Sequence, residues 1–271
     1  MNLSGNTILI TGGTSGIGLE LATRLRQMGN TVIVTGKDPR KIEEAHKKLP
    51  GIYSFQSDVS DPEAVSLLYD AVTGTFPALN ILINNAGIMR KINLLATENA
   101  LNEIGREIDT DLTGPVRMVK QFLPQLMSQQ TAAIVNVSSG LAFVPFPVAP
   151  IYCAAKAGLH SFTQSLRVQL KKTTVKVFEL APPITQTPLL TKDLRIGELT
   201  LVKPMDLTLM VARAIKGLEN DEFEIRPGPS NILKVLSRIA PQLVLNRLSK
   251  PAEAMLLADG QRVASSRMEV T

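Results

Sequence analysis

The chain has 271 residues, of which 44% are hydrophobic, and its formal net charge is +5. This composition suits a soluble protein of one large domain or two small ones, and no apolar run approaches the roughly 18 residues of a membrane span. Three tyrosines and no tryptophan leave few stacking surfaces for bases, so the positive charge favours an anionic cofactor over nucleic acid.

Cysteine and histidine are too scarce for a disulfide framework or a zinc cluster. The only cysteine is Cys153, and the two histidines are His46 and His160. We therefore expect no metal site. The first residues carry no basic segment before an apolar run, so we expect no secretory signal and a cytoplasmic protein.

Apolar runs and amphipathic stripes alternate along the chain. The runs predict strands at 7–10, 31–35, 53–56, 81–83, 133–137, 175–180 and 222–225. The stripes predict helices at 18–28, from 39, at 61–73, at 100–127 with a bend at Pro115, at 152–170 and at 206–218. Asp38 and Asp61 each precede a proline, which is typical of a helix N-cap.

Strands separated by helices predict parallel pairing with right-handed crossovers. The fold class is therefore α/β, with a single doubly wound, Rossmann-type parallel sheet covered by helices on both faces. We expect residues 1–228 to form this dinucleotide-binding catalytic domain. Residues 229–271 would form a helical C-terminal extension whose last ten residues are disordered.

Three glycines lie between the first predicted strand and the first predicted helix. Gly12, Gly16 and Gly18 have the spacing T-G-x-x-x-G-x-G, a relative of the dinucleotide fingerprint. Glycines allow backbone N–H groups to approach a pyrophosphate, and the helix N-terminus favours its negative charge. A turn that merely packs is the alternative, but its position at the start of the domain favours cofactor binding.

The end of the second strand bears on the choice of cofactor. Folds that bind NAD usually place an acidic residue there for the ribose 2′-hydroxyl, whereas this chain has Gly36 and then Lys37. A lysine would attract a 2′-phosphate, so NADP(H) is favoured and NAD(H) is possible. In the alternative, Lys37 is a solvated surface residue and Asp38 contacts the ribose.

Tyr152 and Lys156 are separated by just over one helical turn, so they project from the same face. An ammonium beside a phenol favours the phenolate and lowers the pKa of the tyrosine. Ser139 would hold a substrate oxygen while Tyr152 transfers the proton. These residues predict the interconversion of an alcohol and a carbonyl.

Taken together, the motifs of residues 5–228 resemble the short-chain dehydrogenase/reductase family. The matching residues, in chain order, are Thr11-Gly12-Gly13-Thr14-Ser15-Gly16-Ile17-Gly18, Asp58-Val59, Asn84-Asn85-Ala86-Gly87, Ser139, Tyr152 and Lys156. The resemblance implies that the glycine turn, with Thr14, Ser15 and Ile17, lines the pyrophosphate. It assigns Asp58 and Val59 to the adenine, Asn85, Ala86 and Gly87 to cofactor support, and Pro182 and Thr187 to the nicotinamide.

For the catalytic residues, the resemblance implies that Ser139 orients the substrate oxygen and that Tyr152 is the acid or base. Lys156 would bind the nicotinamide ribose and lower the pKa of Tyr152. The chain departs from the family at Pro183, where Pro-Gly is usual, and at Asp111, where the family places an asparagine. An ionised Asp111 would raise the pKa of Tyr152 and bias the enzyme toward carbonyl reduction, unless it acts as a plain isostere.

Within the family, the similarity is greatest to bacterial oxidoreductases encoded with lipoteichoic-acid D-alanylation genes. Three stretches support this: residues 139–143, residues 181–183 and residues 226–228. The resemblance does not supply a substrate. The apolar segment 141–148 and a lid at 188–204 suggest a partly apolar carbonyl compound, although these residues could instead pack together or against another subunit.

Beyond Gly228, a basic amphipathic pattern indicates packing on the domain, a homodimer or homotetramer contact, or contact with a membrane surface. Three functions remain open. The first is an NADP(H)-dependent oxidoreductase acting on CH–OH groups and carbonyls. The second is a dinucleotide-binding regulatory protein with weak or no catalysis, and the third is a membrane-peripheral enzyme.

Overall fold

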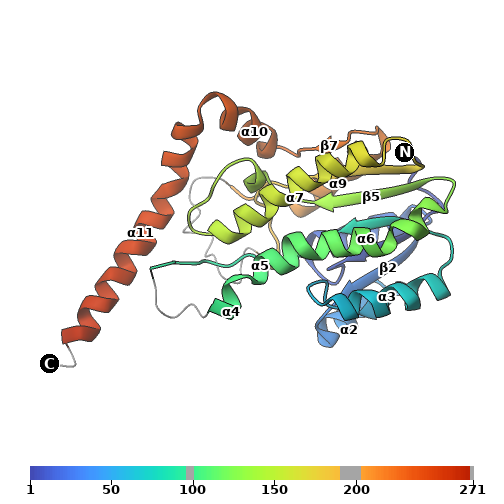
Figure 1. Ribbon diagram of the computed structural model, residues 1–271, viewed down its shortest axis with the longest axis horizontal. Coiled ribbons are helices and arrows are strands. Elements are labelled where there is room, and N and C mark those ends of the chain that lie inside the picture. Colours follow the sequence, from blue (N-terminus) through green and yellow to red (C-terminus); the bar gives the residue numbers. More distant parts are fainter. Residues whose placement is uncertain (96–100, 190–202, 269–271) are drawn as a thin grey trace.

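The computed structural model describes residues 1–95, 101–189 and 203–268. In this part of the chain, seven parallel strands form one sheet in the order β3-β2-β1-β4-β5-β6-β7 (Figure 1). The strands are β1 (Thr7–Thr11), β2 (Thr31–Gly36), β3 (Tyr53–Gln56), β4 (Leu79–Asn84), β5 (Ala132–Val137), β6 (Val175–Leu180) and β7 (Glu224–Ile225). The predicted Rossmann-type sheet is therefore confirmed.

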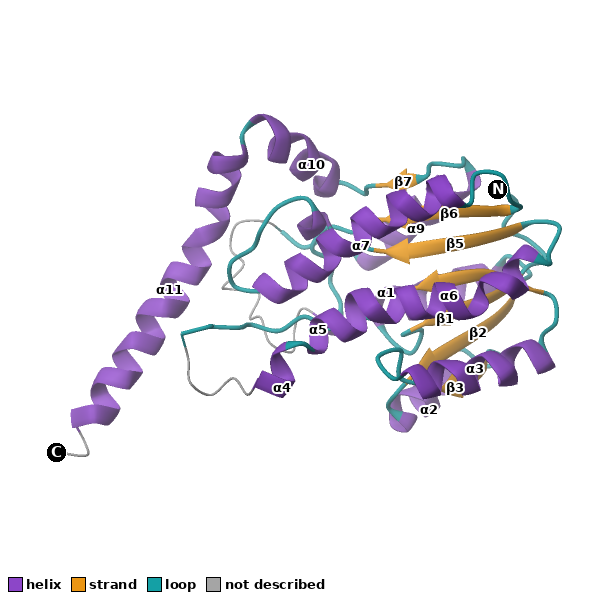
Figure 2. Cartoon of the chain, in the orientation of Figure 1, coloured by secondary structure: helices purple, strands orange, loops and turns teal. Residues whose placement is uncertain are grey.

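Helices cover both faces of the sheet (Figure 2). One face carries α1 (Gly16–Gln27), α2 (Pro39–Lys48) and α9 (Leu207–Glu219), and the other carries α3 (Pro62–Thr75), α6 (Gly114–Met127) and α7 (Pro150–Gln169). Side chains alternate along each strand. In β1, Ile8 and Ile10 therefore pack under α1 and α9, whereas Leu9 packs under α3 and α6.

The N-caps of α2 and α3 have the form predicted from the sequence. The carboxylate of Asp38 accepts a hydrogen bond from the backbone N–H of Arg40, and that of Asp61 accepts one from Glu63. The following proline begins each helix, where its missing N–H leaves no bond unmade.

The order of strands reverses at β1, which lies between β2 and β4. Crossovers from the two sides therefore diverge at this point and leave a crevice beyond the carboxyl ends of the strands. The glycine turn follows β1, and residues 85–87 follow β4. The topology thus brings two of the predicted cofactor segments together.

The long helix predicted at 100–127 is not continuous, and this expectation was wrong. The described part comprises α4 (Leu101–Ile104), α5 (Arg106–Ile108), a π-helical turn η1 (Asp109–Thr113) and α6. Pro115 lies in the first turn of α6 and has no N–H to donate to the carbonyl of Asp111, four residues earlier. The irregularity is therefore a widened turn before the proline, and Asp111 lies within it.

The C-terminal extension consists of α10 (Pro229–Ile239) and α11 (Pro241–Met268). Helix α10 packs on the short helix η2 (Gly140–Ala142), and α11 leads away from the sheet (Figure 1). We expected disorder from residue 262, but the helix continues to Met268. Within the described residues, no helix has the length and apolar character needed to cross a membrane.

Candidate active site

A cavity of about 900 Å³ lies at the carboxyl ends of the strands, and it collects nearly all of the site residues expected from the sequence. The expected residues that line it are Gly12, Thr14, Ser15, Gly16, Ile17, Lys37, Asp58, Val59, Asn85, Ala86, Gly87, Asp111, Ser139, Tyr152, Lys156, Pro182 and Thr187. Gly18 does not line the cavity. Most of the lid expected at 188–204 lies outside the described residues.

The glycine turn is held against the loop that follows β4. Gly12 has a φ of +62°, and a side chain there would place its Cβ 2.8 Å from the Cα of Ala86. The side-chain amide of Asn85 donates to the carbonyls of Thr11 and Gly12, each at 3.1 Å. Asn85 therefore fixes the turn, and Gly18 is required because a Cβ there would come within 2.5 Å of that amide.

The N-terminus of α1 faces the cavity with its backbone donors available. Its N-cap residue, Ser15, makes no capping hydrogen bond through its side chain, and the first turn contains no acidic residue. The partial positive charge of a helix N-terminus favours phosphate oxygens. This arrangement, together with the space left by the glycines, fits a dinucleotide pyrophosphate.

The far end of the cavity, beside β2, carries both positive and negative charge. The ammonium of Lys37 lies 3.7 Å from the carboxylate of Asp58, and both side chains are partly exposed. Burial alone would raise the pKa of Asp58, but hydrogen bonds from Ser60 and the charge of Lys37 hold it below its ordinary value. Lys41, which we did not predict, also lines this end.

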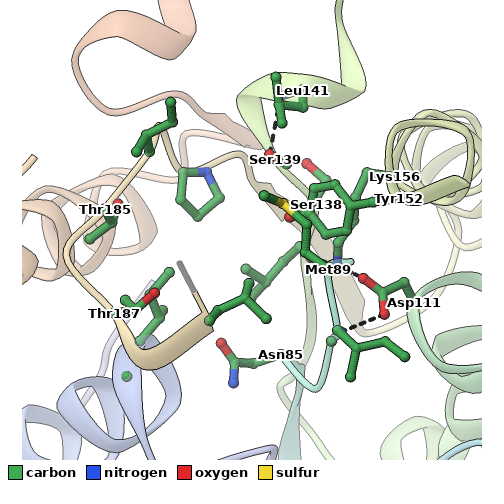
Figure 3. A pocket seen from close by; sticks show the side chains of 18 of the residues that line it. Asn85, Met89, Asp111, Ser138, Ser139, Leu141, Tyr152, Lys156, Thr185 and Thr187 are labelled. Atoms are coloured by element: carbon green, nitrogen blue, oxygen red, sulfur yellow. Dashed lines mark hydrogen bonds and ion pairs between the residues drawn. The ribbon is translucent and has the colours of Figure 1, made fainter. Parts of the chain in front are cut away.

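The predicted catalytic residues meet where β5 ends and α7 begins. Tyr152 and Lys156 project from α7 on the same side, next to Ser139 (Figure 3). The Nζ atom of Lys156 lies 5.7 Å from the centre of the Tyr152 ring and donates a hydrogen bond to the carbonyl of Val137 at 3.1 Å. Ser139 is the N-cap of η2, and its Oγ accepts a hydrogen bond from the N–H of Leu141.

The family model for short chain dehydrogenases matches residues 6–195. The chain belongs to the short-chain dehydrogenase family. It is 47% identical over 189 residues to DltE of Bacillus subtilis, an uncharacterized oxidoreductase, and the match covers 70% of this chain and 75% of that protein. This confirms the resemblance to the oxidoreductases encoded with D-alanylation genes.

Two solved structures show the same fold. A short chain dehydrogenase of Burkholderia cenocepacia in complex with NADP is 22% identical, with a TM-score of 0.78, covering 92% of this chain and 99% of that one. A short chain dehydrogenase/reductase of Burkholderia phymatum in complex with NAD is 21% identical, with a TM-score of 0.77. The match covers 88% of this chain and 94% of that one.

In this short-chain dehydrogenase, Asp111 is completely buried beside Lys156. Its Oδ1 accepts a hydrogen bond from the N–H of Ile88 at 2.8 Å, and its Oδ2 forms an ion pair with Nζ of Lys156 at 3.4 Å. Burial raises the pKa of Asp111 to about 6, although Lys156 and the Ile88 hydrogen bond oppose that change. The carboxyl therefore keeps its proton to a higher pH than an ordinary aspartate does.

The pKa of Tyr152 lies above its ordinary value, mainly because the phenol is buried and secondly because Asp111 is negative. A hydrogen bond with Ser139 opposes both effects. The net direction is opposite to the lowering expected from Lys156. The main reason is that burial disfavours the charged phenolate, and the negative charge of Asp111 adds to this effect.

A buried network that no sequence pattern indicated lies beneath Ser139. Glu179 of β6 is fully buried and accepts a hydrogen bond from the hydroxyl of Ser138, the neighbour of Ser139. Its other oxygen lies 2.7 Å from Nδ1 of His160, one turn beyond Lys156 on α7. The network ties the end of β5 to α7 and thereby helps to fix Ser139 relative to Tyr152.

The extension also contributes to the site, which the sequence left open. Leu248, Ala252 and Met255 of α11 pack in one cluster with Tyr152 and Met89. The extension therefore packs on its own domain, in the same cluster as Tyr152. The amphipathic spacing within 229–271 was the only signal of this in the sequence.

The raised pKa of Asp111 makes stability depend on pH. Its native pKa of about 6 exceeds the ordinary 3.8, so the native state binds more protons between these values and the free energy of unfolding falls as pH rises through this window. In the wild type, the free energy of unfolding should fall by on the order of 2 kcal/mol between about pH 4 and pH 7 because of Asp111. Asp111→Asn cannot titrate at this position and should not show this fall.

Urea unfolding of both proteins over this pH range measures the difference, with the exposed Asp109→Asn as the matched control. Parallel pH dependences for wild type and Asp111→Asn would show that Asp111 does not titrate in this window.

Proposed function

We propose that this protein is an NADP(H)-dependent oxidoreductase that interconverts a carbonyl and an alcohol. The observation that carries the proposal is that Ser139, Tyr152 and Lys156 share one cavity with the glycine turn and the N-terminus of α1. A proton-transfer group and a phosphate-binding element thus line the same cavity. A nicotinamide dinucleotide bound there would supply or accept the hydride.

The residues of the chain supply the proton and the orientation. Ser139 positions the substrate oxygen, and Tyr152 donates its phenolic proton to the oxygen as negative charge develops there during reduction. Lys156, held by Val137 and Asp111, places a positive charge near the phenolate that forms. In the direction of oxidation, Tyr152 must first lose its proton, which its high pKa disfavours.

The choice of NADP(H) rests on the charges near β2. Lys37 and Lys41 both line the cavity. The carboxylate of Asp38 also lies there, but it caps α2 and accepts a hydrogen bond from Arg40. With its carboxylate engaged, Asp38 is a poor partner for a ribose 2′-hydroxyl, whereas the two ammonium groups suit a 2′-phosphate. A dinucleotide-binding regulatory protein is the alternative that the Asp111–Lys156 pair favours.

Tyr152→Phe should reduce kcat by about 100-fold or more with any carbonyl that the wild type reduces, because the proton donor is lost. NADPH binding, measured by fluorescence titration, should change little. A carbonyl panel monitored by NADPH absorbance supplies the substrate, and the exposed Tyr53→Phe is the control. NADPH binding by the wild type without turnover of any panel member would favour the regulatory alternative.

Asp111→Asn should shift the pH–rate profile for alcohol oxidation to lower pH. Removing the negative charge lowers the pKa of Tyr152, so the phenolate forms in less alkaline solution. The measurement is kcat/KM for oxidation against pH in wild type and variant. An unchanged oxidation profile would contradict the role given to Asp111.

Lys37→Glu should weaken NADPH binding by about tenfold while leaving NADH binding within a few-fold, because only NADPH carries the 2′-phosphate. Equilibrium titration with each cofactor measures this, and Lys48→Glu, which is exposed and does not line the cavity, controls for net charge. An equal loss for both cofactors would mean that Lys37 does not read the phosphate.

A further inference from the structure

The cavity continues beyond Tyr152 to a wall formed by the C-terminal extension. The wall residues of α10 are Ile232, Leu233 and Leu236, and those of α11 are Leu243, Val244, Arg247, Leu248 and Pro251. Their spacing places each set on one face of its helix. Apart from Arg247, every side chain in this wall is apolar.

The wall is fixed to the catalytic domain by contacts at both ends. Lys234 of α10 pairs with Glu224 and lies over the ring of Phe143, with Nζ 5.1 Å from the ring centre. In α11, Ala252 and Met255 are buried in the cluster that contains Tyr152. The wall therefore does not depend on a ligand for its position.

Some wall residues are nevertheless exposed. Leu243 is 63% exposed and Ile232 is 59% exposed, although both face the cavity. Large apolar side chains that are left accessible inside a cleft are typical of a binding surface. An aliphatic ligand in the cleft would cover them, and each buried methylene would add to affinity.

The charged side chains of the cavity are also placed at particular positions. Among the described residues that line the cavity, the carboxylates are Asp38 and Asp58, at the adenine end, and Asp111, which is paired with Lys156. The wall itself carries Arg247, one turn beyond Leu243. In the described part of the chain, Arg247 forms no ion pair or hydrogen bond. Its guanidinium is therefore available for an anionic group on a ligand.

We propose that the substrate is an aliphatic carbonyl compound bearing an anionic group, and that the extension selects it. The aliphatic chain of the substrate lies along α10 and α11, and Arg247 binds its carboxylate or phosphate. The reaction at the carbonyl rests on the function proposed above, whereas the binding surface does not. Arg247 and Leu243 would thus be specificity-determining residues for this reaction.

The first experiment measures binding to the full chain without cofactor by isothermal titration calorimetry. The probes are decanoate, decan-1-ol, hexanoate and decyl phosphate. Decanoate should bind about tenfold more tightly than decan-1-ol because of its charge. It should also bind at least about tenfold more tightly than hexanoate because its aliphatic chain is longer. Comparison of decanoate with decyl phosphate identifies which anion Arg247 prefers.

The second experiment uses variants that leave the fold intact. Arg247→Gln should abolish the preference for decanoate over decan-1-ol, and the exposed Leu243→Ser should weaken both ligands about threefold. Lys250→Gln is the matched control, since Lys250 is exposed on the same helix and does not line the cavity. It should behave as the wild type does.

Equal affinity for decanoate and decan-1-ol, or the same result for Arg247→Gln and Lys250→Gln, would overturn the proposal. Decanoate binding with the predicted dependence on Arg247, but without turnover of any carbonyl, would uphold this binding surface and count against the proposed reaction. Turnover of carbonyls without a preference for chain length or charge would uphold the proposed reaction and count against this binding surface.

Discussion

The ammonium of Lys156 is almost completely buried. The arrangement of the site depends on the groups that pair with this charge. A buried charge is costly unless it is paired and hydrogen-bonded. Here the carbonyl of Val137 and the carboxylate of Asp111 provide the two partners. They come from the end of β5 and from the π-helical turn, so one charge joins these segments to α7. The position of Tyr152, four residues before Lys156, is fixed by the same contacts.

Asp111 in turn depends on the loop that follows β4. One oxygen is held by the N–H of Ile88, and a Cβ at Gly87 would lie 3.1 Å from the other. The loop thus gives the carboxylate both a hydrogen bond and room. Its Oδ1 accepts the Ile88 hydrogen bond, while its Oδ2 makes no hydrogen bond within the described residues and instead lies 3.4 Å from Nζ of Lys156. An asparagine that accepted the Ile88 hydrogen bond with its one oxygen would turn its NH₂ group, a donor, toward the ammonium. The acid in this chain is therefore suited to its surroundings, and its charge favours a protonated Tyr152.

The extension gives this site a character that the common fold does not dictate. Parallel sheets of this type place ligands at the carboxyl ends of the strands, and the loops and appended segments there decide which ligand fits. In this protein, α10 and α11 supply an aliphatic wall and the guanidinium of Arg247. The catalytic residues would set the reaction, and the extension would set the substrate.

Local patterns in the sequence were sufficient for the strands, the helix caps at Asp38 and Asp61, and the glycine turn. They also placed Tyr152 and Lys156 on one helix face. Each of these depends on neighbours within about one turn or one strand of the chain. Pro115 marked the place of the irregular stretch before α6, but not its form. A proline can bend or widen a helix, and the turn that forms here also holds Asp111 in its contact with Ile88.

Only the tertiary structure decided which distant groups meet. The hydroxyl of Ser138 meets Glu179, 41 residues away, and Glu179 meets His160. The cluster that contains both Met255 and Tyr152 joins segments still farther apart in the chain. Such contacts depend on how complete elements pack, and the chain order contains no local signal for them. The sequence by itself determined the fold and its chemical groups, and packing decided the pKa of those groups and the shape of the cavity around them.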